Sequence, residues 1–165
     1  QVHGPARRVP PWLSPGAELV VGDMRDADAV ARALEGVEIV FHLAAAVGVG
    51  QSMYQIADYT AVNTLGTAHL LQTLVDRRQE LQRLVVASSM SIYGEGRYRR
   101  PDGRPAMQAQ RSVEQLRAHE WELRDRDGVP LEPVPTDEAK PLEPSSIYAL
   151  TKADQETMVL QIGAA

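Results

Sequence analysis

Three apolar segments with strand character, separated by helical patterns, limit the possible folds of this chain most strongly. The segments are "AELVVGD" (17–23), "VEIVFHLAAA" (37–46) and "LQRLVVASS" (81–89), and residues 26–36 and 57–78 between them carry apolar residues at helical spacing. The nearly continuous apolar run at 37–46 is typical of a strand buried on both faces. Strands that alternate with helices form right-handed βαβ crossovers, so the pattern predicts an α/β fold with a parallel, doubly wound sheet.

Capping residues mark the ends of the predicted helices. The helix at 26–36 lies between an aspartate and a glycine. A last helix begins after Pro144, where Ser145 or Ser146 can cap it, and runs to about Ile162.

The regular alternation stops between about 95 and 140. This segment is rich in Arg, Pro, Gly and Asp, and "SVEQLRAHEWEL" (112–123) within it begins with a Ser-x-x-Gln capping box that predicts a short helix. A connection of this length inside a domain is usually functional or disordered. A lid over a substrate is the preferred interpretation, with an oligomer contact and disorder as alternatives.

Composition excludes several classes of function. A net charge of −5 argues against nucleic-acid binding, and the lack of cysteine excludes disulfides and thiol chemistry. No run of about 18 apolar residues predicts a membrane span. We therefore expect a soluble, cytoplasmic protein with a small-molecule partner. The four histidines, His3, His42, His69 and His119, are scattered along the chain, which predicts no metal site. His42 lies in the apolar strand and is expected to be a core residue.

Small and polar residues follow each of the three predicted strands. They are Asp23, residues 44–48 and residues 88–91. In parallel α/β sheets, ligands bind at the carboxyl ends of the strands. The sequence therefore predicts a ligand site at this edge of the sheet.

Several short stretches carry a family resemblance. They are "GDMRD" (22–26), "FHLAAAVGVGQS" (41–52), "VNTLGT" (62–67), "SSMSIYG" (88–94) and "YALTK" (148–152). Together and in this order they resemble the extended short-chain dehydrogenase/reductases, the NAD-dependent nucleotide-sugar epimerase and dehydratase family. The resemblance implies a Rossmann-like fold and NAD as cofactor.

Two parts of the family pattern are not found in this sequence. One is the Gly-x-x-Gly-x-x-Gly loop after a first strand, which cradles the pyrophosphate, and the other is the C-terminal lobe that holds the sugar nucleotide. The resemblance thus implies that residues 1–165 form a truncated, partial NAD(P)-binding Rossmann domain with an irregular insertion at about 95–140. We expect the chain by itself to bind NAD weakly and to be inactive.

The catalytic residues implied by the resemblance are Tyr148, Lys152 and Ser89. A tyrosine that acts as a base near neutral pH must lower its pKa from about 10 by about three units, which takes roughly 4 kcal/mol. A lysine ammonium one turn further along the helix supplies part of this stabilisation. Tyr148 would be general base and then acid, Lys152 would also bind the nicotinamide ribose, and Ser89 would hydrogen-bond the reacting oxygen. The alternatives are a solvated helix face for the Tyr–Lys pair and a strand-end cap for Ser89.

The resemblance also implies residues that bind the cofactor. Asp23 would contact the adenine, with a turn cap as the alternative, and the backbone of Ala44 and Ala45 would line the cofactor. Asn63 belongs to the same region, where we expect it to fasten the strand ends together rather than to touch the ligand. Tyr148 and Lys152 complete this set.

Residues after the catalytic serine indicate the reaction. Met90 and Ser91 occupy the places where the sugar 4,6-dehydratases of the family carry an acidic pair, so the resemblance favours a C4 epimerase that acts on a nucleotide sugar. The sequence is most similar to the dTDP-L-rhamnose 4-epimerase branch, whose substrates are dTDP-sugars. A reductase or dehydrogenase of the same family and a non-catalytic cofactor-binding fragment are the alternatives. The resemblance also implies a homodimer formed through helices like 57–78 and 144–162.

Overall fold

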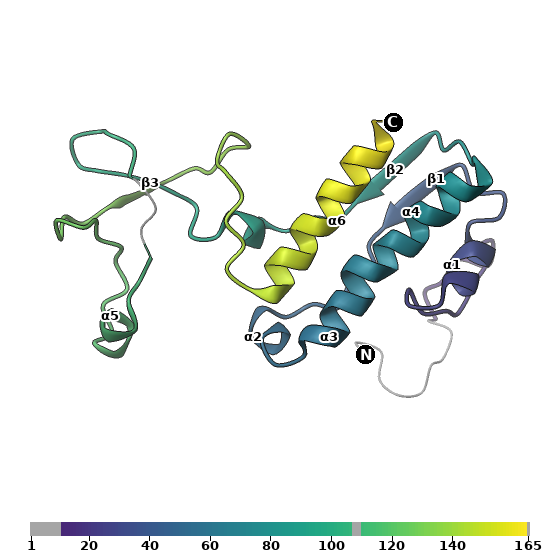
Figure 1. The fold of residues 1–165 in the computed structure, drawn as a ribbon, viewed down its shortest axis with the longest axis horizontal. Coiled ribbons are helices and arrows are strands. Elements are labelled where there is room, and N and C mark those ends of the chain that lie inside the picture. Colours follow the sequence, from purple (N-terminus) through teal and green to yellow (C-terminus); the bar gives the residue numbers. More distant parts are fainter. Residues whose placement is uncertain (1–10, 107–109, 165) are drawn as a thin grey trace.

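The computed structural model describes residues 11–106 and 110–164. Its α/β body contains two parallel strands, β1 (Ile39–His42) and β2 (Arg83–Val86), paired in register from Ile39 opposite Arg83 to His42 opposite Val86. Two long helices, α4 (Gly66–Arg77) and α6 (Ile147–Gly163), lie side by side against one face of this pair (Figure 1). The parallel pairing agrees with the predicted sheet.

The helical segments form where the sequence predicts them. The helix predicted at 57–78 is confirmed as a continuous run of α3 (Ile56–Tyr59), a π-helical stretch η1 (Thr60–Leu65) and α4. A short α2 (Val49–Ser52) precedes it, and α1 (Ala27–Ala33) packs against α4.

Side chains cap the three helices whose caps the sequence predicts. Asp26 accepts hydrogen bonds from the backbone N–H groups of the first turn of α1, and Ser146 caps α6 by accepting from the N–H of Ala149 at 3.1 Å. Ser112 caps α5 (Val113–Arg117) in the same way. Each cap satisfies a donor that has no partner within its helix, which explains why the starts were readable from the sequence.

The core lies between α1, α4, α6 and the near face of β1 and β2. On β1 the burial alternates, because Val40 and His42 face the helices whereas Ile39 and Phe41 face away. Phe41 is 66% exposed, since no helix of the described chain covers the far face. The prediction that 37–46 is buried on both faces is therefore wrong for this chain. Six buried residues form the centre of the core: Val30, Leu34, Leu70, Leu71, Leu74 and Val159.

The strand predicted at 17–23 is not formed. Its apolar residues Leu19, Val20 and Val21 are exposed, and its backbone pairs with neither β1 nor β2 in the described residues. A strand exists only when its N–H and C=O groups find a neighbouring ladder. The apolar character of residues 17–23 is therefore not enough to form a strand.

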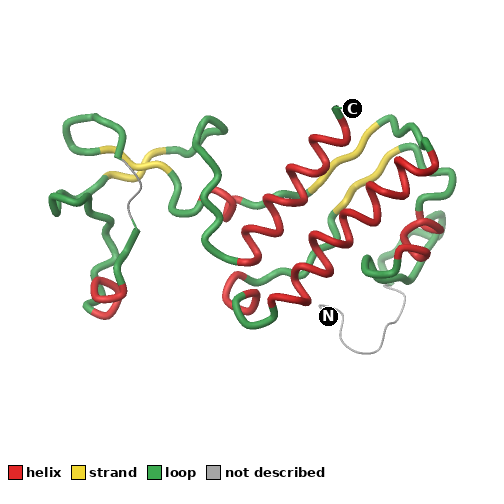
Figure 2. The backbone as a smooth tube through the Cα atoms, in the orientation of Figure 1, coloured by secondary structure: helices red, strands yellow, loops and turns green. Residues whose placement is uncertain are grey.

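The segment between 95 and 140 extends to one side of the α/β body as an insertion lobe (Figures 1 and 2). It holds an antiparallel pair, β3 (Arg97–Arg99) and β4 (Glu132–Val134), together with the short helix α5. The described part of the lobe is thus folded, which argues against the disorder alternative.

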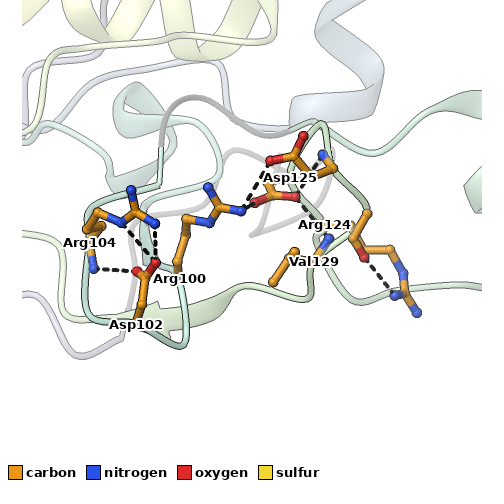
Figure 3. Close-up of polar contacts among 8 residues, drawn as sticks. Arg100, Asp102, Arg104, Arg124, Asp125 and Val129 are labelled. Atoms are coloured by element: carbon orange, nitrogen blue, oxygen red, sulfur yellow. Dashed lines mark hydrogen bonds and ion pairs between the residues drawn. The ribbon is translucent and has the colours of Figure 1, made fainter.

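An ion pair joins two turns of the insertion lobe (Figure 3). The guanidinium Nη2 of Arg100 lies 2.9 Å from Asp125 Oδ2 and 3.2 Å from Asp127 Oδ2. Asp125 Oδ1 accepts hydrogen bonds from the N–H groups of Asp127 and Val129, both at 2.9 Å. Asp125 Oδ2 is buried without a hydrogen bond of good geometry, so the charge of Arg100 is what compensates it.

Replacing Asp125 with alanine should loosen the insertion lobe and leave the α/β body intact. The change removes two hydrogen bonds and the nearer of the two carboxylates that pair with Arg100, so the amides of Asp127 and Val129 should exchange with solvent about tenfold faster or more. Hydrogen exchange read by mass spectrometry or NMR measures this. Glu132→Ala is the matched control, because it removes only an exposed ion pair with Arg99. Equal exchange rates in the two variants would contradict the prediction.

Candidate active site

Tyr148 stands in the first turn of α6, and its backbone is held from across the chain. The N–H of Tyr148 donates to Ser52 Oγ at 2.9 Å, and the Ser52 hydroxyl donates to the carbonyl oxygen of Val49 at 2.6 Å. Ser52 is fully buried. The short helix α2 therefore sets where α6 begins, and with it the position of the tyrosine.

The ring of Tyr148 packs against a second tyrosine. Its centroid lies 6.5 Å from that of Tyr59, with the ring planes at 89°, an edge-to-face contact. Tyr59 is buried. A Cβ at Gly48, where φ is +140°, would lie 2.8 Å from Tyr59 Oη, so only glycine fits beside this ring.

Lys152 follows Tyr148 by one helical turn and is buried, with 3% of its surface exposed. Its ammonium donates a hydrogen bond to Gln155 Oε1 at 2.7 Å. Burial lowers the pKa of Lys152, because the charged form loses solvation. Among the described residues no hydrogen bond joins Lys152 directly to Tyr148.

His42, at the end of β1, belongs to a buried polar cluster with Thr67 and Gln155. His42 Nε2 lies 2.8 Å from Thr67 Oγ1 and 3.1 Å from Gln155 Nε2. Burial and, second, the charge of Lys152 lower the pKa of His42. The predicted role of a core histidine with satisfied hydrogen bonds is confirmed. Sequence reasoning missed Thr67 and Gln155, whose only signal was a polar side chain on an otherwise buried helix face.

Asn63 connects the loop after β1 with α6. Its Oδ1 accepts from the N–H of Ala46 at 2.7 Å, and its Nδ2 donates to the Ala46 carbonyl at 3.1 Å and to Thr151 Oγ1 at 2.9 Å. The residue lies in the π-helical stretch η1, a geometry common at functional sites. Asn63 thus fastens structural elements, as expected.

Ala44 and Ala45 follow β1 at the carboxyl edge of the sheet. Ala44 is exposed and Ala45 half-buried, and their backbone groups form no hydrogen bond within residues 11–106 and 110–164. Small side chains and unpaired backbone groups at this edge let a ligand approach the backbone closely.

Ser89 follows β2 and caps a 3₁₀ turn, Met90–Tyr93, that packs against α6. Its Oγ accepts from the N–H of Ser91 at 3.2 Å and lies 2.8 Å from the Ser91 hydroxyl. Ser89 therefore acts as the strand-end cap that was the alternative prediction. Ser89 is half-buried and lies at the same edge of the sheet as Ala44.

Asp23 lies in an exposed turn before α1. Hydrogen bonds from the side chain and the backbone N–H of Arg25 lower the pKa of Asp23 to about 2. The carboxylate therefore stays charged at neutral pH. No contact joins Asp23 to Tyr148, Lys152 or Ser89 in the described structure.

Two further kinds of feature are absent from the described residues. No three His, Cys, Asp or Glu side chains gather there as metal ligands. None of the helices in that part of the chain has the length and apolar character needed to cross a bilayer.

Comparison with known proteins decides the family. Residues 1–115, more than half of the chain, match the model of the NAD dependent epimerase/dehydratase family. The chain belongs to this family. The cofactor expected from the sequence, NAD, is the one on which the family depends.

Individual relatives agree with this assignment to the epimerase/dehydratase family. The chain is 37% identical over 158 residues to dTDP-L-rhamnose 4-epimerase from Burkholderia thailandensis, covering 94% of this chain and 42% of that protein. The solved dTDP-glucose 4,6-dehydratase DesIV from Streptomyces venezuelae has 27% identity and a TM-score of 0.57, covering 87% of this chain and 33% of that one.

A solved UDP-glucose 4-epimerase from Thermus thermophilus shares the fold, with 24% identity and a TM-score of 0.62, over 92% of this chain and 38% of that one. These matches confirm the predicted Rossmann-like α/β fold. The chain thus spans less than half the length of the relatives it matches.

Proposed function

We propose that the protein is an NAD-dependent nucleotide-sugar 4-epimerase and that this chain carries its catalytic core. The observation that carries the proposal is the placement of Tyr148 and Lys152 one turn apart on α6, a helix that Asn63 ties to the loop after β1 by bonding both Thr151 and Ala46. The 37% identity to a dTDP-L-rhamnose 4-epimerase favours a dTDP-sugar as substrate.

The residues present fit NAD at the carboxyl edge of the sheet. The backbone groups of Ala44 and Ala45, the ammonium of Lys152 and the carboxylate of Asp23 are the groups that would hold it. When bound, NAD would accept the hydride from C4 of the sugar and return it to the other face.

Tyr148 would perform the proton transfer. Its phenolate oxygen takes the proton from the C4 hydroxyl as the 4-keto sugar forms, and gives a proton back when the alcohol is restored. The positive charge of Lys152 stabilises the phenolate, and the Ser89 hydroxyl donates a hydrogen bond to the sugar oxygen. Each role stays within the chemistry of the side chain concerned.

The residues after Ser89 argue against dehydration. Elimination of water needs an acid, but the neighbouring positions hold Met90, whose side chain is exposed, and Ser91, which is engaged with Ser89. A reductase or dehydrogenase is the remaining enzymatic alternative, and a non-catalytic cofactor-binding fragment is the third.

The test is turnover by the intact gene product, purified with NAD and incubated with dTDP-sugars. We expect interconversion of the C4 epimers, followed by proton NMR, with no net NADH absorbance. Stoichiometric NADH formation or consumption would instead establish a dehydrogenase or reductase. NAD binding without any turnover would support the non-catalytic alternative.

The homodimer through α4 and α6 stays a prediction.

A further inference from the structure

The buried ammonium of Lys152 is held by a neutral partner. Among the described residues it takes part in no ion pair, and its observed hydrogen bond goes to the amide oxygen of Gln155. The neighbouring carboxylate of Asp154 accepts from Thr64 instead, at 3.0 Å. A buried charge of this kind requires a fixed acceptor, since leaving it unpaired is costly.

Gln155 is itself fixed from the other side. It is 0% exposed, and its Nε2 donates to Thr67 Oγ1 at 2.8 Å. Thr67 donates its own proton to the carbonyl of Asn63 at 2.7 Å, so Thr67 Oγ1 is an acceptor for the amide. If the amide of Gln155 were flipped, its NH₂ group would face the ammonium, donor against donor, and the buried ammonium would lose its acceptor. The amide therefore has one stable orientation, with Oε1 toward Lys152.

We propose that Gln155 is a positioning residue, which holds the Lys152 ammonium in place for Tyr148 without neutralising its charge. A carboxylate at this position would hold the ammonium equally well, but it would cancel the field that stabilises a phenolate on the same helix. Among the described residues, the other titratable group that interacts with Lys152 is His42 of β1, which burial keeps neutral. This inference rests on the proposed function only for the role of Tyr148, since the hold on Lys152 is a property of the fold.

The deciding variant is Gln155→Glu in the intact gene product, compared with Gln161→Glu on the exposed side of the same helix. We expect Gln155→Glu to lower kcat at neutral pH by about tenfold, with KM changed by no more than about twofold. The rising, low-pH limb of the pH–rate profile should move to higher pH, because a carboxylate beside Lys152 cancels the charge that favours the Tyr148 phenolate. Gln161→Glu should leave both quantities unchanged.

A second measurement does not depend on activity. In the intact gene product, selective ¹³Cε-lysine labelling and the loss of one signal in Lys152→Met identify the Lys152 resonance. We expect Lys152 to titrate at lower pH in Gln155→Leu than in the parent, and at higher pH in Gln155→Glu. Gln161→Leu is the control for the apolar change.

The outcomes separate this inference from the proposed function. An unchanged Lys152 titration in folded Gln155→Leu and Gln155→Glu would overturn the inference and reduce Gln155 to a core residue, and so would an unchanged pH–rate profile in an active Gln155→Glu. If the parent turns over no dTDP-sugar, the proposed function fails, but the Lys152 titration still decides whether Gln155 holds the ammonium.

Discussion

Tyr148→Phe in the intact gene product is expected to reduce turnover by about a thousandfold while leaving NAD bound. Phenylalanine keeps the ring that packs on Tyr59, and the backbone N–H that donates to Ser52 is unaffected. Only the hydroxyl that takes and returns the proton is lost. Steady-state kinetics with the dTDP-sugar and quantification of bound NAD measure the two properties separately.

Tyr54→Phe is the matched control for this substitution. Tyr54 is 90% exposed in the turn between α2 and α3, so the same loss of a hydroxyl should leave kcat within about twofold of the parent. Retention of turnover in Tyr148→Phe would show that another group removes the proton. In that case Lys152 would have no phenolate to stabilise, and its proposed role would be wrong as well.

The second large effect is expected on stability. Asn63→Ala removes three hydrogen bonds at a residue that is 0% exposed, and it leaves both backbone groups of Ala46 and the Thr151 hydroxyl without this partner. Since buried polar groups without partners are costly, we expect the free energy of unfolding to fall by about 2–4 kcal/mol. Urea unfolding of the intact gene product measures the change.

Gln161→Ala serves as the control, because Gln161 is an exposed amide on α6. Its free energy of unfolding should change by less than about 0.5 kcal/mol. A similarly small change in Asn63→Ala would mean that water replaces the lost hydrogen bonds, and that Asn63 does not fasten the loop after β1 to α6. Asn63→Asp adds a check, because it keeps an acceptor for the Ala46 N–H but loses both donated bonds.

Local interactions account for the parts of the fold that were predicted well. The caps at Asp26, Ser112 and Ser146 act within three residues, so each is visible in a short stretch of sequence. The strand predicted at 17–23 was wrong, because a strand needs a neighbouring strand to pair with and apolar character does not specify one.

In the candidate site, too, local features were predicted and contacts between distant residues were not. Its motif residues Tyr148 and Lys152 were found from their helical spacing and their companions in the chain. Gln155 and Ser52 were missed, because their roles come from contacts with residues far away in sequence: Gln155 meets His42 across 113 positions, and Ser52 meets Tyr148 across 96. No short pattern records such pairs.

The sequence by itself therefore determined the parallel α/β class, the helices and their starts, and the family with its candidate catalytic residues, because these depend on periodicity, capping and local motifs. Only the tertiary structure decided that one face of the β1–β2 pair is covered, that Asn63 ties the loop to α6, and that Lys152 is buried against Gln155. These features depend on the packing of α4, α6 and β1 against one another, and burial is what makes a hydrogen bond there indispensable.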